Sequence, residues 1–159
     1  MSVGNNKSFS FNAPWGWLLK GTSLGVVLLF AALAFLEKVG GWSLVLLFLI
    51  LLVALPFIVR GYAVSDDMLI IRRLGWETRF PLADLKSVDV SPNVMRGAIR
   101  LCGNGGIFSF TGLYRNKALG NFRSFANDGG KTVVLRFAKQ TIVVSPDNPE
   151  KFVETIRPR

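Results

Sequence analysis

A basic window between Asp89 and Asp128 carries the residues whose types best suit binding chemistry. It contains no Asp or Glu, and aromatic side chains lie among its five cations: Arg96, Arg100, Arg115, Lys117 and Arg123. Cations of this kind favour anionic partners, and near a charged bilayer each contributes about 1 kcal/mol. We therefore predict an anionic-surface site at these five residues, with membrane lipids or an acidic protein as partner. The alternative is a solvated face whose aromatic neighbours belong to the core.

Residues for catalysis or metal binding are scarce. The chain has no His and a single Cys, which excludes disulfide frameworks, His-based acid–base chemistry and the usual zinc sites. Cys102 has no His partner, so we expect a small buried residue there. Glycines at 103, 105, 106 and 112 could form an anion-binding nest. The Lys-Ser/Thr ending of a P-loop is absent, so nucleotide binding is not expected, and turn and bulge geometry is the favoured interpretation. We predict no enzyme, no catalytic residue, no metal and no cofactor.

The overall charge agrees with an anionic partner. The formal net charge is +9, which suits a lipid surface, an acidic protein or a nucleic acid. No nucleic-acid recognition motif accompanies the basic residues, so nucleic acid is not expected as a partner. The oligomeric state stays open.

Two long apolar runs lie before residue 60. They cover 21–36 and 42–59, contain no charge and are separated by five residues. A membrane-spanning helix needs about 20 apolar residues, so we predict a transmembrane helical hairpin at 15–60, with spans at about 17–36 and 42–59. A tail at 1–14 precedes it, and a domain at 61–159 follows. The alternative for the first run is a secretory signal peptide cleaved near Ala32-Leu33-Ala34.

Positive charges flanking the runs predict the orientation of this hairpin. Lys and Arg concentrate on cytoplasmic loops, and here they flank both outer ends, so both termini are expected in the cytoplasm. The residues expected to anchor the helices at the membrane interface are Trp15, Trp17, Lys20, Trp42 and Arg60. Gly21 and Gly25 form a G-x-x-x-G motif that lets helices approach closely. It is expected to pack against the second helix, or alternatively to form a dimer face.

Short β-prone segments follow residue 60. Alternating patterns and turn residues predict strands at 62–64, 68–73, 76–80, 87–90, 107–111, 122–126, 132–137 and 141–144. Asp147 or Asn148 then caps a helix with Pro149 in its first turn, and apolar residues recur at helical spacing. A sheet followed by one amphipathic helix predicts an α+β domain.

These segments resemble bacterial membrane proteins with a pleckstrin-homology-like (PH-like) domain. The resemblance is carried by the runs 103–112, Arg115-Asn116-Lys117, Leu119-Gly120 and 142–149, and it includes the two apolar segments. It implies a strongly bent, seven-stranded antiparallel sheet capped by a C-terminal helix, without catalytic residues. It also implies a membrane-anchored binding or scaffolding module at the cytoplasmic face of the bacterial inner membrane. The alternative is an accessory or regulatory subunit of a larger membrane enzyme or transport complex, with a membrane protein as partner.

Overall fold

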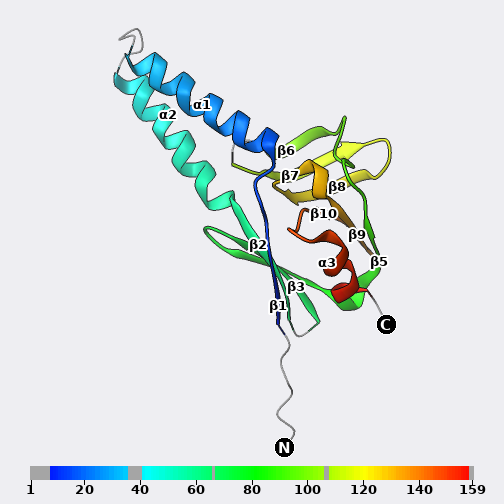
Figure 1. The fold of residues 1–159 in the computed structure, drawn as a ribbon. Coiled ribbons are helices and arrows are strands. Elements are labelled where there is room, and N and C mark those ends of the chain that lie inside the picture. Colours follow the sequence, from blue (N-terminus) through cyan, green and yellow to red (C-terminus); the bar gives the residue numbers. More distant parts are fainter. Residues whose placement is uncertain (1–7, 36–40, 66, 106–107, 158–159) are drawn as a thin grey trace, which may run out of the picture.

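The computed structural model describes residues 8–35, 41–65, 67–105 and 108–157. Two helices project from one side of two β-sheets, and a third helix lies against the sheets (Figure 1). The helices are α1 (Trp17–Phe35), α2 (Gly41–Ala54) and α3 (Pro149–Ile156). The strands are β1 (Phe9–Asn12), β2 (Val59–Ser65), β3 (Met68–Arg73), β4 (Glu77–Pro81), β5 (Leu85–Val90), β6 (Ile99–Gly105), β7 (Phe110–Asn116), β8 (Gly120–Ala126), β9 (Val133–Phe137) and β10 (Thr141–Val144).

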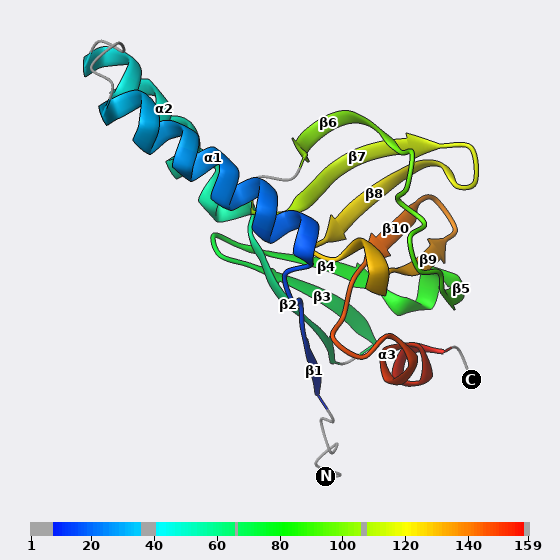
Figure 2. The same ribbon diagram turned by 45° about the horizontal axis from the view of Figure 1, so that its top comes forward.

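Helices α1 and α2 lie side by side and extend away from the sheets (Figures 1 and 2). Large apolar side chains on both helices are exposed, with Trp17 and Trp42 each 88% accessible and Phe35 89% accessible. Contiguous apolar surface of this kind marks a region that interacts with something outside the chain.

Within the described ranges, none of the helices combines the length and the apolar character that a membrane crossing requires. The transmembrane hairpin predicted at 15–60 is therefore wrong. The integral, multi-pass placement in the bacterial inner membrane, with both termini in the cytoplasm, depended on that hairpin and is wrong with it.

Two local features explain the correction. Helix α2 has 14 residues, about 21 Å at 1.5 Å per residue, whereas a hydrocarbon core is about 30 Å thick. Pro56 cannot extend the helix, so Leu55–Phe57 form a 3₁₀ turn and the chain enters β2 at Val59. In α1, the polar residues Lys20, Thr22 and Ser23 interrupt the apolar sequence of the N-terminal half of the helix.

The first sheet has the strand order β1-β2-β3-β4, with all neighbours antiparallel. Strands β2 and β3 confirm the strands predicted at 62–64 and 68–73, and β3 has the predicted bounds. Strand β1 was not predicted, and it pairs with β2 from Phe9↔Val64 to Asn12↔Gly61. Gly61 permits this pairing, because a Cβ there would lie 2.6 Å from the carbonyl oxygen of Phe11.

The second sheet has the order β5-β9-β10-β8-β7-β6. Strands β8 and β10 pair in parallel, and the other pairs are antiparallel. The predicted single antiparallel sheet is thus replaced by two sheets with one parallel pairing. Strand β10 has its predicted bounds, β7 begins at Phe110 rather than at residue 107, and β6 was not predicted.

Both faces of the second sheet are covered, which makes β9 and β10 almost continuously buried. Val133, Leu135 and Ile142 lie on one face, in the main core that the two sheets and α3 enclose. Val134 and Val143 lie on the other face, in a second, smaller core with Tyr114 and Phe122 (both buried). The 91–98 segment, between β5 and β6, crosses in front of this second face (Figure 2).

Helix α3 confirms the predicted C-terminal element. The side chain of Asn148 caps it by accepting a hydrogen bond from the backbone N of Lys151 at 3.1 Å, and Pro149 occupies its first turn. Phe152 and Ile156 enter the main core, where the Phe152 ring packs edge-on against Phe11, with ring centroids 5.1 Å apart.

A buried polar junction joins the two sheets. Tyr62 is fully buried; its hydroxyl donates to the carbonyl oxygen of Phe125 at 2.6 Å and accepts from the backbone N of Ser145 at 3.0 Å. Asn127, also fully buried, donates through Nδ2 to the carbonyl oxygens of Ala13 at 3.0 Å and Val59 at 2.7 Å. The Oγ of Ser145 accepts from the backbone N of Asn127 at 2.8 Å.

The first prediction concerns this junction. Tyr62→Phe leaves a buried carbonyl and a buried N–H without the hydroxyl, so the free energy of unfolding should fall by about 1–3 kcal/mol. Chemical denaturation at neutral pH measures the change. If the free energies of unfolding of the variant and the natural chain agreed within experimental error, the hydroxyl would not stabilise the junction.

The same residue predicts a pH dependence. Burial raises the pKa of Tyr62 to about 12, whereas an unfolded tyrosine ionises near 10. Between these values the unfolded state releases the proton first, so stability falls as pH rises, while below about pH 10 the group contributes no pH dependence. From about pH 9 to about pH 11, the Tyr62→Phe protein should therefore lose less stability than the natural chain. Equal losses would contradict the prediction.

Candidate functional site

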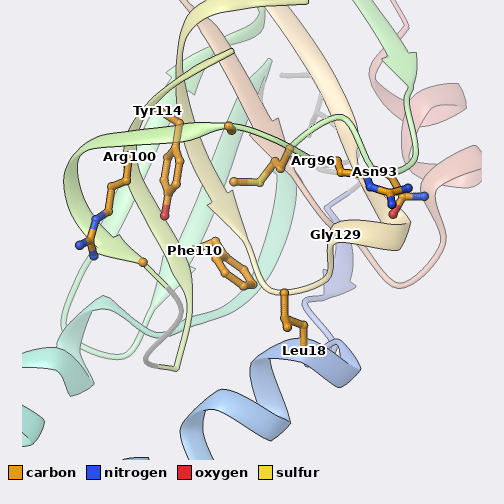
Figure 3. A pocket seen from close by; sticks show the side chains of 10 residues that line it. Leu18, Asn93, Arg96, Arg100, Phe110, Tyr114 and Gly129 are labelled. Atoms are coloured by element: carbon orange, nitrogen blue, oxygen red, sulfur yellow. The ribbon is translucent and has the colours of Figure 1, made fainter. Parts of the chain in front are cut away.

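A cavity of about 620 Å³ lies between the 91–98 segment, β6, β7 and the start of α1. Its lining combines apolar side chains with two guanidinium groups (Figure 3): Leu18, Asn93, Met95, Arg96, Ala98, Arg100, Gly105, Phe110, Tyr114 and Gly129. The volume lies within the range of about 300–1,000 Å³ typical of small-molecule sites. This cavity is called the β6–β7 pocket below.

Hydrogen bonds fix the 91–98 segment over the sheet. The backbone N of Ser91 donates to the carbonyl oxygen of Thr132 at 2.9 Å, and that of Asn93 donates to Gly129 O at 2.8 Å. At its middle, Val94 O accepts from Nδ2 of Asn116 at 2.7 Å. Met95 is tied to β8 because the Ser124 hydroxyl donates to its sulfur at 3.2 Å. The wall of the pocket is therefore held from the 129–132 segment before β9 and from the β7–β8 hairpin.

The charged side chains stand on either side of the aromatic lining. In Figure 3, Arg100 lies on one side of Tyr114 and Phe110, and Arg96 lies on the other. Arg100 donates through Nη1 to the carbonyl oxygen of Gly103 at 3.2 Å. Burial raises the pKa of Tyr114, and the nearby positive charge of Arg100 opposes this rise. The Tyr114 phenol is therefore neutral at physiological pH and offers a polar group beside the cations.

A family model for the bacterial PH domain matches residues 60–159, well over half of the chain. The chain belongs to the bacterial PH domain family. No curated protein and no solved structure matches the chain. PH domains are non-catalytic binding modules that commonly bind lipids or proteins. The resemblance noted in the sequence is thus confirmed for the PH domain, and its membrane-protein aspect is not.

The PH domain divides the five predicted cations between two faces. Arg96 and Arg100 line the β6–β7 pocket, and Arg96 also borders a neighbouring hollow of about 430 Å³ with Lys117. Arg115 follows Tyr114 in β7 and therefore points to the opposite face of the sheet. Arg123 also lies on that opposite face, with its Cζ 5.4 Å from the centroid of the Phe125 ring.

Sequence reasoning missed several residues of these sites. Leu18 and Asn93 line the pocket. Leu18 is remote in sequence from the pocket strands, and Asn93 is an uncharged residue in the segment before β6, so neither had a signal in the sequence. Arg73 lies over the rings of both Trp76 and Phe125. The signal available in the sequence for this contact was the spacing of three residues between Arg73 and Trp76, because the turn between β3 and β4 brings the two side chains together.

The residues proposed as membrane anchors have varied surroundings. Trp15 packs against Phe108 with ring centroids 6.0 Å apart, whereas Trp17, Lys20, Trp42 and Arg60 are exposed. Their assigned role depended on the spanning hairpin that the structure lacks in its described residues.

The predicted packing glycines lie on the surface of α1. Among the described residues, no atom lies within 4 Å of a Cβ added at Gly21 or Gly25, and their role in helix packing stays a prediction. Cys102 is exposed, which corrects the expectation of a buried residue. Among the described residues, no group of three or more His, Cys, Asp or Glu side chains could hold a metal.

Glycines bring β6 and β7 close together beside the pocket. Gly103 and Gly112 are paired and have φ of +112° and +148°. A Cβ at Gly112 would overlap the carbonyl oxygen of Cys102. This contact sets the spacing of the two strands that carry Arg100 and Tyr114.

We expect Gly112→Ala to destabilise the PH domain by about 1–3 kcal/mol, because the new Cβ meets rigid backbone at a positive φ. The control is Gly21→Ala, where the side chain enters open space on α1 and alanine favours the helix by up to about 1 kcal/mol. Thermal and chemical denaturation of the two variants measure the difference. If both substitutions had the same effect, the close approach of the strands would not be a stability constraint.

Proposed function

We propose that this PH domain is a non-enzymatic binding module whose β6–β7 pocket takes an anionic amphiphile, such as a single acidic lipid molecule. The observation that supports the proposal is the pairing of two guanidinium groups with an apolar-lined cavity of about 620 Å³. A ligand with an acidic head and an apolar tail satisfies both parts of such a lining.

The charge around the pocket favours an acidic head group. Arg96 and Arg100 are exposed, and among the described residues neither forms an ion pair with an acidic side chain. The acid-free window from Asp89 to Asp128 supplies the reason, since the pocket strands carry no carboxylate. An arginine can bind a phosphate or carboxylate through two parallel hydrogen bonds.

The apolar part of the lining favours a hydrocarbon tail. Leu18 comes from α1 and Phe110 from β7 (Figure 3). Met95 and Ala98 come from the 91–98 segment. Each buried CH₂ group of a ligand contributes about 0.8 kcal/mol, so even a short acyl chain adds measurably to affinity. Tyr114 stands between the two regions with a neutral hydroxyl.

Titration of the full-length chain with a soluble short-chain phosphatidylglycerol tests the proposal. The matching neutral probe is phosphatidylcholine of the same chain length, and glycerol phosphate supplies the head group alone. We expect the order phosphatidylglycerol, then glycerol phosphate, then phosphatidylcholine in affinity, with weaker binding as salt rises because the attraction to the arginines is screened.

The variant Arg96→Gln/Arg100→Gln should weaken phosphatidylglycerol binding by about tenfold or more, since hydrogen bonds to charged groups contribute about 1.5–3 kcal/mol each. The control is Arg136→Gln/Lys139→Gln, which removes the same charge from exposed positions in and after β9. Calorimetry measures both. Equal affinity for the two lipids, or an equal loss in both variants, would contradict the proposed site.

A second candidate function is an accessory or regulatory subunit of a larger complex. It is supported by the exposed apolar side chains of α1 and α2, which in a complex would lie against a protein partner. It becomes the leading hypothesis if the pocket variants leave lipid binding unchanged.

A further inference from the structure

Two arginines from different sheets share one aromatic ring on the face of β8 opposite the β6–β7 pocket. The Cζ of Arg73, at the end of β3, lies 4.7 Å from the centroid of the Phe125 ring. The Cζ of Arg123, in β8, lies 5.4 Å from the same centroid. Burial lowers the pKa of Arg73, and the positive charge of Arg123 lowers it further.

Acidic side chains do not neutralise this pair. Glu77, the carboxylate of the adjacent strand β4, forms its ion pairs with Arg72 and Arg79. Among the described residues, neither Arg73 nor Arg123 has an acidic partner. Two cations held together without a counter-charge repel each other, and a bound anion would turn that repulsion into attraction.

The donors of Arg73 are only partly used. Its Nη2 donates to the hydroxyl of Thr78 at 3.0 Å, while its buried Nε has no acceptor among the described residues. A guanidinium presents five N–H donors in a fixed planar fork, so donors remain on Arg73 as well as on Arg123. Two such forks match the several oxygens of a phosphate group better than the two oxygens of a carboxylate.

Aromatic residues hold the pair in place. Trp76 lies under Arg73, with 5.2 Å between the Cζ and the ring centroid, and packs edge-on against Phe57 at 4.9 Å between ring centroids. Rings in contact with guanidinium planes limit their motion and lower the local dielectric, and both effects strengthen binding of an anion.

We propose that Arg73 and Arg123 form a second anion site, which takes a phosphate group. The phosphate can be a free ion, a soluble phosphate ester or the head group of a lipid. The site is independent of the β6–β7 pocket, because β8 separates their two faces.

The test uses the full-length chain with Arg96→Gln/Arg100→Gln already in place, so that failure of the pocket proposal does not affect the result. The side-chain Nε–H resonances of ¹⁵N-arginine-labelled protein are recorded, and the Arg73 signal is assigned by its absence in Arg73→Lys. The probes are inorganic phosphate, glycerol phosphate and soluble short-chain phosphatidylglycerol, each at constant ionic strength maintained with chloride.

We expect a saturable shift of the Arg73 signal that Arg123→Gln weakens at least tenfold and Arg136→Gln leaves unchanged. Phosphate should also raise the melting temperature of the parent protein, but not that of Arg123→Gln, since a ligand of the folded state stabilises it. A response to all three probes indicates the phosphate group alone, and a response restricted to phosphatidylglycerol indicates a lipid head group. No saturable response to any probe, or a response that survives Arg123→Gln, overturns the proposal.

Discussion

The fold depends on satisfying a small set of polar groups where the two sheets meet. A buried N–H or carbonyl without a partner costs free energy comparable to a lost hydrogen bond, and the junction of Tyr62, Asn127 and Ser145 contains several such groups. It connects β2 in the first sheet to β8 and the end of β10 in the second. These hydrogen bonds hold β2 against β8 and the residues after β10, beside the main core that the two sheets enclose.

The second sheet shows how one architecture presents two separate faces. Its buried strands have apolar residues on both sides, so one face contributes to the main core and the other needs its own cover. The 91–98 segment supplies that cover and leaves the β6–β7 pocket at its border with α1. Arg100 and Arg123 belong to the same sheet, but their side chains lie on opposite faces of it.

Local patterns predicted the elements whose signals are local. Strand β3, strand β10 and helix α3 were predicted because a short β-prone apolar run, or apolar residues at helical spacing, lies between clear turn residues. Strands β1 and β6 were not predicted, because β1 has only four residues and β6 ends in the sequence Gly-Asn-Gly; both are completed by pairing, β1 with β2 and β6 with β7. The predicted hairpin failed where the apolar run 42–59 was treated as one helix, although Pro56 ends α2 early and the last residues enter a strand. The basic window grouped five cations as one anionic-surface site, which stays a prediction. In the structure, Arg96 and Arg100 line the β6–β7 pocket, whereas strand register places Arg123 on the opposite face, at the ring that Arg73 also contacts.

The junction has a consequence for the modular character of the domain. The family match begins at residue 60, inside β2, yet Asn127 donates to carbonyl oxygens of Ala13 and Val59, which both precede that boundary. Strand β1 and Phe11 are likewise outside the match, although Phe11 belongs to the main core. The hydrogen bonds and core contacts that complete the domain therefore extend beyond the matched segment. A fragment cut at the family boundary would have an unpaired sheet edge at β2 and an incomplete core, so its behaviour would not represent that of the domain within the whole chain.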